Sequence, residues 1–338
     1  MSQNRCGAII NRYSHDEDSR PQIRHALPGM TMALLSVVLV NYKRFGDTLE
    51  CINSLRASSL RDIDIIVVDN ASNDGSVQQI RNAHPDLHLI SNTENLGFAG
   101  GNNVGIRRAL ESGSRYVLLL NNDTVVDKKA LEALVNTMEQ NPDAGITGGK
   151  ILYFNQPGTI WFGGGKFNRN SGFGRHEGIG MADDGSFDTM HPCDFITGCC
   201  LLARREVFEQ IGLLDEDFFT YLEDVDFCIR ARDKGYSILY QPRAVIHHKV
   251  SSSTAWDSPL YIYFNLRNKL LFLRKRSGPT RWIPYIPQLT YFYVRQFVRL
   301  LLKQRNMQAT RAAWRGLIDG LRNHTGKNGR GHLDEILG

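Results

Sequence analysis

The chain has 338 residues, of which 42% are hydrophobic and 22% are charged, and this composition excludes a wholly disordered protein. A chain of this length can bury the core of one large domain or of two smaller ones. The net charge of +5 is unevenly distributed, because residues 261–338 contain 15 Lys and Arg against 3 Asp and Glu, which leaves a net charge of −7 on the first 260 residues.

The N-terminal residues and the cysteines bear on localisation. Residues 1–32 lack the apolar core of a signal peptide, so we expect a flexible N-terminal extension ahead of the folded part. The six cysteines include no CxxC pair and no spacing typical of a zinc site. They therefore indicate the reduced thiols of a cytoplasmic protein.

Strand and helix patterns alternate along the first half of the chain. Apolar, β-branched runs predict strands over 34–42, 64–69, 87–92 and 116–123, and helical spacing predicts helices over 46–58, 76–83, 102–113 and 128–141. Such alternation predicts an α/β fold with a mostly parallel twisted sheet flanked by helices, as in Rossmann-like nucleotide-binding folds.

The second half is less regular. Residues 145–191 combine glycines, aromatics and short alternating runs, which predict hairpins and loops. A strand, a helix, an acidic segment and a second helix are expected over 195–236, and the next strand ends at His247 and His248. After residue 258 the chain becomes basic and aromatic, and we expect a helical C-terminal extension.

Polar residues stand where three predicted strands end, which is the edge at which parallel sheets bind ligands. Asp123 is a natural ligand for Mg²⁺ or Mn²⁺, although a capped turn before the next helix would also explain it. Asp69 suits a nucleobase or ribose, with a solvated turn as the alternative. The glycines at 97, 100, 101 and 105 do not match GxGxxG, but a loop of this kind can approach a pyrophosphate.

A later acidic cluster suits general-base chemistry. Glu223, Asp224 and Asp226 lie close together, and neighbouring carboxylates raise one another's pKa. The alternative is a helix N-terminus stabilised by acidic residues. Because successive strand residues point to opposite faces, only one of His247 and His248 is expected to face a site.

In this order, the motifs resemble the family 2 inverting glycosyltransferases of the GT-A fold, and among them the rhamnosyltransferase-like branch. The matching segments are SVVLVNY, IIVVDNASNDGS, NLGFAGGNNVGI, LLLNNDT, the run from GCCLLARREVF to CIRARDKGY, and IHHKVSSS. They cover residues 34–253. The family's DxD motif reads Asn121-Asn122-Asp123 here, so its first acid is missing, which would weaken metal binding.

The resemblance implies roles for individual residues. Asp224 would be the catalytic base, with Glu223 and Asp226 as acceptor-side candidates. Asp123 and His248 would hold a divalent cation. The donor nucleotide-sugar would be bound by Asn41, Tyr42, Asp69, Asn102, Asn103, Asn121 and Asn122. The glycine-rich segment 163–174 would form a loop that closes over the donor.

The implied activity is transfer of a sugar, with rhamnose from dTDP-rhamnose as the candidate, to a hydroxyl of a saccharide or lipid-linked acceptor in cell-surface polysaccharide synthesis. The catalytic domain would span 33–258, with a donor half 33–125 and an acceptor half 126–258, followed by a helical region 259–338. Two alternatives stay open. One is a sugar nucleotidyltransferase, although the segment VNYKRFGD is a poor match to the Gly-rich triphosphate loop of such enzymes. The other is a non-catalytic nucleotide- or glycan-binding scaffold. No motif indicates nucleic-acid binding.

The basic C-terminal region predicts contact with an anionic membrane surface. In the segment 282–303, an apolar stripe follows helical spacing, whereas Arg295 and Arg299 argue against a transmembrane helix. The stripe comprises Val294, Phe297, Val298 and Leu301. We expect a protein at the inner face of the cell membrane, with packing of the stripe against the rest of the chain as the alternative.

Overall fold

The computed structural model describes residues 33–168, 173–250, 258–281, 283–303 and 305–327. The extension predicted over 1–32 and the C-terminal residues 328–338 lie outside these ranges. Residues from 32 onward belong to one compact unit.

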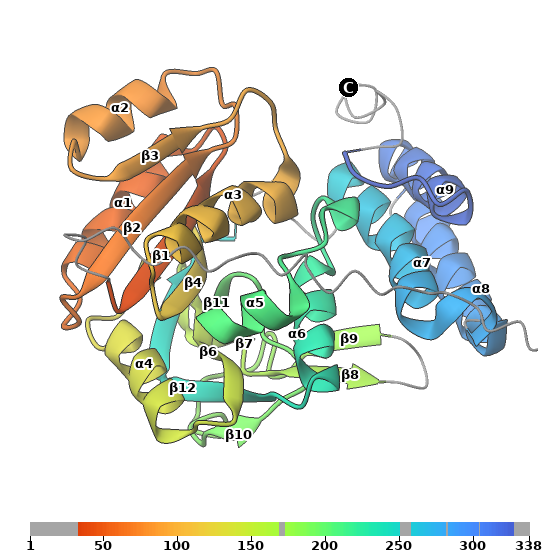
Figure 1. The fold of residues 1–338 in the computed structure, drawn as a ribbon. Helices are drawn as coiled ribbons and strands as arrows, with labels where there is room; N and C mark the ends of the chain where they lie inside the picture. Colours follow the sequence, from red (N-terminus) through yellow and green to blue (C-terminus); the bar gives the residue numbers. More distant parts are fainter. Residues whose placement is uncertain (1–32, 169–172, 251–257, 282, 304, 328–338) are drawn as a thin grey trace, which may run out of the picture. The chain divides into compact units, whose positions relative to one another are not determined.

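The first half of the chain forms a continuous set of parallel strands in the sheet (Figure 1). Its strands are β1 (Leu35–Asn41), β2 (Ile63–Asp69), β3 (His88–Ser91) and β4 (Tyr116–Asn121), in the order β3-β2-β1-β4. The connecting helices are α1 (Phe45–Arg56), α2 (Ser76–Ala83) and α3 (Gly97–Glu111). The apolar residues of β1, β2 and β4 are almost all fully buried, which confirms the strand prediction.

The register of these strands brings the predicted polar residues together. Asn41 pairs with Asp69 across β1 and β2, and Val40 pairs with Asn121 across β1 and β4. Residues far apart in sequence therefore meet at one edge of the sheet.

The second half extends the same sheet. Strand β11 (Cys200–Arg204) runs antiparallel to β4 and β6 (Ala144–Tyr153), and β12 (Ser237–His248) runs parallel to β6. The peripheral strands are β5 (Thr124–Val126), β7 (Gln156–Phe162) and β10 (His191–Pro192), and α4 (Ala130–Gln140) packs against β6 and β12. The hairpin β8 (Gly165–Asn168) and β9 (Phe173–His176) forms a separate two-stranded sheet.

The expectation of hairpins and loops over 145–191 is wrong for β6. This strand lies in the interior of the sheet, and all but its last residue are buried. Its glycines obscured the strand pattern, although the fold requires two of them. A Cβ on Gly148 would lie 2.2 Å from Ile196 Cγ2, and one on Gly149 would lie 2.2 Å from the Ala244 carbonyl oxygen.

The glycines at 97–105 also differ from expectation, because they lie within α3. A Cβ on Gly105 would lie 2.3 Å from Val38 Cγ1, so this glycine lets α3 pack closely on β1. Gly97 has a positive φ of +72°, and a Cβ there would lie 2.4 Å from the Phe219 carbonyl oxygen. Close helix packing, not a phosphate loop, explains these two glycines.

The remaining elements carry the acidic cluster and the C-terminal region. They are α5 (Arg205–Ile211), η1 (Glu216–Phe218), α6 (Glu223–Asp233), α7 (Pro259–Arg281), η3 (Ile283–Tyr285), α8 (Ile286–Val298), the π-helical turn η4 (Arg299–Lys303) and α9 (Met307–Leu321). Helices α7 and α9 pack side by side, and α7 also contacts η1 (Figure 1). Contacts therefore cross the domain boundary that we predicted at 258/259.

The predicted apolar stripe of α8 is divided between two environments. Val294, Val298 and Leu301 are exposed, whereas Phe297 packs edge-on against Trp314 of α9. In the described part of the chain, every helix is too short or too polar to cross a bilayer. The exposed part of the stripe thus remains available as a surface.

Candidate active site

A hydrogen-bonded network joins the ends of β1 and β2. Asn41 Nδ2 donates to Asp69 Oδ1 at 2.7 Å and lies 3.1 Å from Ser72 Oγ. Asn41 Oδ1 in turn accepts from Thr48 Oγ1 at 2.8 Å. The side chains of Asn41 and Asp69 are buried, so the network holds them in one orientation.

Asn122, after β4, and Tyr42, after β1, extend this network along the polar edge of the sheet. Asn122 Nδ2 donates to Thr48 Oγ1 at 2.8 Å, which ties the end of β4 to α1. Tyr42 follows Asn41 and its side chain is exposed, with Lys43 Nζ 5.2 Å from its ring centroid. A fixed polar edge beside an exposed aromatic ring suits a nucleoside.

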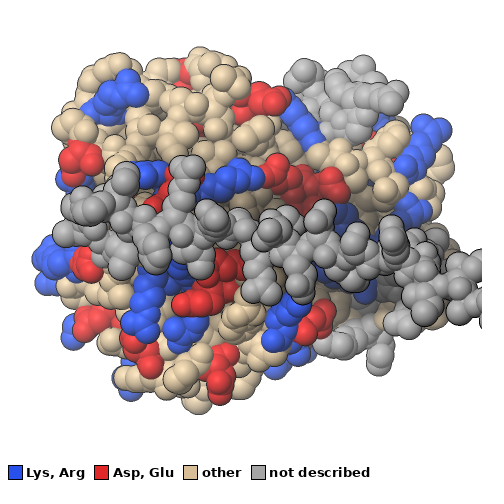
Figure 2. Space-filling model, in the orientation of Figure 1, with Lys and Arg blue, Asp and Glu red and all other residues tan. Residues whose placement is uncertain are grey.

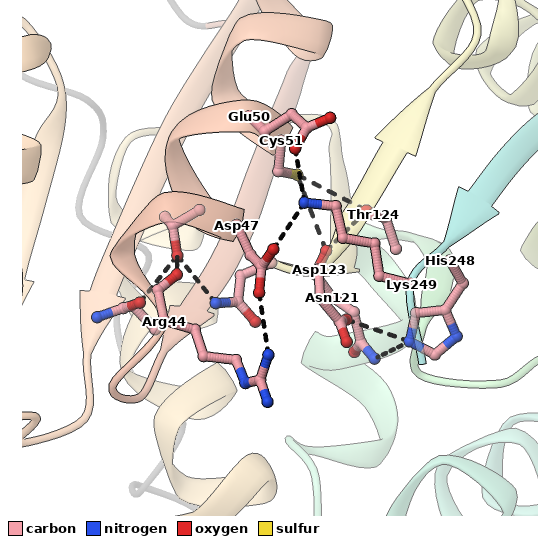
Figure 3. A network of polar contacts seen from close by, with 12 residues as sticks. Arg44, Asp47, Glu50, Cys51, Asn121, Asp123, Thr124, His248 and Lys249 are labelled. Atoms are coloured by element: carbon pink, nitrogen blue, oxygen red, sulfur yellow. Dashed lines mark hydrogen bonds and ion pairs between the residues drawn. The ribbon is translucent and has the colours of Figure 1, made fainter. Parts of the chain in front are cut away.

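Asp123 and His248 face each other at the centre of the site (Figure 3). His248 Nε2 lies 3.1 Å from Asp123 Oδ1 and 3.4 Å from Asn121 Nδ2. His247 points elsewhere, with its Nε2 3.2 Å from Asp127 Oδ1. The pairing of β12 with β5 explains this choice, because alternate residues of β12 point to opposite faces.

The segment after His248 is anchored to α1. Lys249 Nζ lies 2.6 Å from both Asp47 Oδ1 and Glu50 Oε2 (Figure 3). These ion pairs are partly exposed, so their main effect is to fix the direction of the chain next to His248.

Trp161 and His176 support His248, and sequence reasoning missed both. The Trp161 ring packs edge-on against His248, with 4.6 Å between centroids, and against His176 at 4.9 Å. Burial lowers the pKa of His176 to about 4, so its ring is neutral at physiological pH. Their sequence context, an aromatic in a β-hairpin pattern, indicated packing only.

The residues around Asp123 suit a divalent cation that takes only a few of its ligands from the protein. Within the described ranges, His, Cys, Asp and Glu nowhere gather in a group of three or more that would form a complete metal site. A carboxylate oxygen and an imidazole nitrogen do face each other, however. Mg²⁺ and Mn²⁺ commonly take few protein ligands and complete their coordination with phosphate oxygens and water.

Asp224 and Glu223 lie at the start of α6, and both line a cavity that His248 also lines. Asp224 accepts backbone N–H groups of Gly198 at 2.8 Å and Val225 at 2.7 Å, and burial raises its pKa. Burial and the nearby charge of Asp224 raise the pKa of Glu223 well above its ordinary value. Glu223 Oε2 is buried and has no hydrogen-bond partner in the part of the chain that the structure describes.

Asp226 points away from the cavity, unlike the other two acids. Its carboxylate pairs with Arg230 at 2.8 Å and with Arg276 of α7 at 2.6 Å, and its side chain is fully buried. Burial raises its pKa, and the two guanidinium groups partly offset this effect. Asp226 therefore does not take the acceptor-side position that we expected, and it connects α6 to α7 instead.

A strained turn immediately precedes Glu223. Phe219, Tyr221 and Leu222 have positive φ angles of 63°, 70° and 74°, a region that such side chains rarely adopt. Asn268 of α7 holds this turn, because its Nδ2 lies 2.7–2.9 Å from the carbonyl oxygens of Phe218, Thr220 and Tyr221. The C-terminal region thus supports the segment that presents Asp224.

The neighbouring Arg267 strengthens this support. Its guanidinium is fully buried and lies 2.8 Å from the Phe218 carbonyl oxygen, and its Nε donates to Asn268 Oδ1 at 2.9 Å. Sequence reasoning missed both residues, although the polar pair inside the apolar run YFNLRNKLLF was a visible signal.

Asn102 and Asn103 have partners other than the expected donor. Asn102 Nδ2 donates to the Phe98 carbonyl oxygen one turn earlier in α3. Asn103 Nδ2 donates to the Leu214 carbonyl oxygen at 2.9 Å and to Glu216 Oε1 at 2.8 Å. Both side chains are buried, and neither lines the cavity described next.

A cavity of about 530 Å³ lies between the end of β4 and the start of α6. Five further residues predicted to bind the donor or the metal are not among those that line it: Asn41, Tyr42, Asp69, Asn122 and Asp123. Asn121 and His248 line it on one side, and Glu223 and Asp224 line it on another. The hairpin β8–β9 contributes Gly174, Arg175 and His176, and α7 and α8 form a further wall. A sugar between the strand ends and α6 would meet a carboxylate at the start of α6.

Comparisons with known proteins agree with this arrangement. A profile of the family described as Glycosyl transferase family 2 matches residues 36–212, slightly more than half of the chain. The chain is 32% identical over 297 residues to the low-salt glycan biosynthesis hexosyltransferase Agl10 of Haloferax volcanii, covering 87% of this chain and 92% of that protein.

A second relative and a solved structure agree with the first. The N-acetylglucosaminyl-diphospho-decaprenol L-rhamnosyltransferase of Mycobacterium tuberculosis is 27% identical, with 74% of this chain and 88% of that protein covered. The mannosyltransferase PcManGT of Pyrobaculum calidifontis, solved with GDP-Man and Mn²⁺, has the same fold, with a TM-score of 0.52 at 17% identity over 90% of this chain and 79% of that one. The protein has the GT-A fold and belongs to glycosyltransferase family 2.

Proposed function

We propose that this glycosyltransferase moves a hexosyl group, with rhamnose as the candidate sugar, from a nucleoside diphosphate to a hydroxyl of a lipid-linked saccharide, inverting the anomeric centre. One observation carries the proposal: the cavity is lined by Asn121 and His248 at the strand ends and by Asp224 at the start of α6. The names of the two relatives, a hexosyltransferase and a rhamnosyltransferase, support the class of sugar.

The donor nucleoside would bind at the ends of β1 and β2. Asp69 offers a carboxylate acceptor for an N–H or hydroxyl group, while Asn41 keeps that carboxylate in position. The exposed Tyr42 ring would stack on the base. Asn121 and Asn122, at the end of β4, would lie beside the sugar diphosphate.

Asp123 and His248 would hold Mg²⁺ or Mn²⁺ in this proposal, which is supported by their 3.1 Å approach. When bound, such an ion offsets the negative charge that develops on the leaving diphosphate. Because Asn121 stands where the family motif has its first acid, one carboxylate and one imidazole would coordinate the cation.

Asp224 would act as the base. The acceptor oxygen forms a bond to the anomeric carbon while the bond from that carbon to the diphosphate oxygen breaks, and the bond electrons leave with the diphosphate. The acceptor hydroxyl proton moves to an Asp224 carboxylate oxygen. Attack opposite the leaving group inverts the anomeric centre.

Glu223 would position the acceptor. Burial and the charge of Asp224 raise the pKa of Glu223, which disfavours the charged form, and a protonated carboxyl group can donate a hydrogen bond. Its buried Oε2 faces no protein partner within the described ranges, which leaves it for a sugar hydroxyl.

The acceptor would be reached at a membrane surface on the cytoplasmic side. Val294, Val298, Leu301 and Leu302 are exposed apolar residues, and α8 and η4 also carry Arg295 and Arg299. In Figure 2, acidic and basic side chains are interspersed over the sheet domain, whereas the visible charged atoms over the C-terminal helices are mostly basic. Anionic lipid attracts such a segment by about 1 kcal/mol per nearby Lys or Arg.

A donor screen tests the activity. Purified protein is incubated with dTDP-rhamnose, UDP-sugars and GDP-mannose, with Mg²⁺ or Mn²⁺, and release of nucleoside diphosphate is measured. We expect release from one donor, and at least tenfold less from the others. Binding of a nucleotide-sugar without release, even with a saccharide extract present, would favour the scaffold alternative.

A further inference from the structure

Two C-terminal helices form a wall of the cavity that the proposed reaction does not use. Besides Tyr261 at its start, α7 lines the cavity with one helix face, whose residues are spaced i, i+3, i+4 and i+7: Ile262, Asn265, Leu266 and Lys269. The cavity is lined from α8 and η4 by Phe292, Gln296 and Arg299, again on one face. We call the seven residues on these two faces, which exclude Tyr261, the helical wall.

Lys269 is the most unusual residue of the helical wall. Its Nζ lies 4.4 Å from the ring centroid of Phe173 on β9 and 5.0 Å from that of Phe292. It forms no ion pair with any carboxylate in the part of the chain that the structure describes. Burial lowers its pKa to about 8. The rings stabilise the cation but accept no conventional hydrogen bond, so its N–H donors remain for a ligand.

The other charges of the cavity divide by position. Arg299 on the helical wall and Arg175 on the hairpin are also cationic. The carboxyl groups, Glu223 and Asp224, both lie at the start of α6. Asp224 accepts two backbone N–H groups, which leaves the two carboxyl groups on the α6 side, away from the cations of the helical wall. The helical wall therefore presents positive charge to whatever enters the cavity.

We propose that the helical wall binds a phosphate group of the acceptor, with Lys269 as the principal cation and Arg299 as the second. The proposal rests on the lipid-linked acceptor proposed above, because such an acceptor joins its sugar to the lipid through phosphate. The sugar hydroxyl would then reach Asp224 while the phosphate lies against α7 and α8. The exposed Val294 and Val298 of α8 would lead the lipid chain away from the site.

Calorimetric binding with three probes tests the proposal on the full chain. Farnesyl diphosphate carries the phosphate and an isoprenoid chain, farnesol carries the chain alone, and dTDP represents the donor nucleotide. We expect wild-type protein to bind farnesyl diphosphate at least about tenfold more tightly than farnesol, as a charge-assisted contact requires.

Substitutions at Lys269 separate charge from packing. Lys269→Met keeps the aliphatic stem between the two rings and should weaken farnesyl diphosphate binding on the order of tenfold, with farnesol and dTDP affinities unchanged. Lys269→Arg keeps the charge and should restore most of the affinity. Arg299→Gln should weaken the same probe, whereas Arg295→Gln, an exposed cation one turn earlier that does not line the cavity, should not.

Three results would overturn the proposal. Unchanged farnesyl diphosphate affinity in Lys269→Met would show that Lys269 does not contact the phosphate. Equal loss of farnesol affinity would show that Lys269 only packs, and loss of dTDP affinity would assign the cation to the donor diphosphate. Because none of these measurements requires turnover, they are independent of whether the donor screen succeeds.

Discussion

Asp226 on α6 and Arg276 on α7 form an ion pair, with 2.6 Å between Oδ1 and Nε, and the Asp226 side chain is fully buried. Arg230 occupies the other carboxylate oxygen at 2.8 Å. The C-terminal region is thus joined to the helix that begins with Glu223 and Asp224. A truncation that removes α7 would therefore damage the site as well as any membrane contact.

Asp226→Asn should lower the free energy of unfolding by about 3 kcal/mol, because it leaves two guanidinium groups without their buried carboxylate. Urea denaturation at neutral pH measures the change. Glu223→Gln is a matched control three residues earlier on the same helix, and it should cause no loss, since Glu223 forms no ion pair with any residue that the structure describes. Equal destabilisation by both substitutions would contradict the structural role of Asp226.

Asn268→Ala should lower kcat on the order of tenfold or more, since small displacements of catalytic groups are costly. The substitution removes the donor to three carbonyl oxygens of the strained turn before Asp224. Steady-state kinetics and calorimetry with dTDP measure the two effects separately. Donor affinity should remain, because Asn41 and Asp69 lie on other elements, and a parallel loss of donor affinity would indicate general unfolding instead.

Asp224→Asn should reduce transfer on the order of 10² or more while donor affinity is kept. Burial raises the pKa of Asp224, so the carboxylate is protonated as pH falls through that raised value and the base is lost. The acid limb of the kcat profile should therefore lie above the ordinary pKa range of an aspartate. If the Asp224→Asn variant were active and the separate Glu223→Gln variant inactive, Glu223 would be the base instead.

Asp123→Asn and His248→Gln should each raise the concentration of Mn²⁺ needed for half-maximal activity by about tenfold or more, as loss of a metal ligand does. His247→Gln is the matched control, because its ring pairs with Asp127 on the other face of β12. Manganese titration of EDTA-treated protein gives the values. Full activity of the wild type in excess EDTA would remove the metal from the mechanism.

Combined Val298→Glu and Leu302→Glu substitutions should reduce flotation with anionic vesicles, because they place acidic groups on exposed apolar positions next to a basic helix. Wild-type protein should float, and less so at high salt. Met181→Glu changes an equally exposed residue outside the C-terminal region and should have no effect. Flotation that survives the double substitution would place the contact elsewhere.

Much of the site could be predicted from the sequence, because parallel strands end at one edge of a sheet. Local apolar runs determine β1, β2 and β4, and the alternation with helices determines their parallel order. The positions of Asn41, Asp69 and Asp123 follow from these two facts alone. Their mutual contacts, such as the 2.7 Å hydrogen bond from Asn41 to Asp69, agree with that expectation.

Other features depended on long-range packing, which a sequence pattern does not contain. Alternation in β12 shows that one of His247 and His248 faces the site, but only its pairing with β5 decides for His248. Asp226 resembles Asp224 in its local sequence, and its direction is decided by Arg276, which is fifty residues away. Strand β6 and the pair Arg267 and Asn268 were missed for the same reason. The glycines of β6 are explained only by the nearby Ile196 and Ala244, and the polar pair only by the carbonyl groups of the strained turn. Short-range periodicity thus determined the sheet and its polar edge, whereas contacts between distant segments decided which side chains form the site.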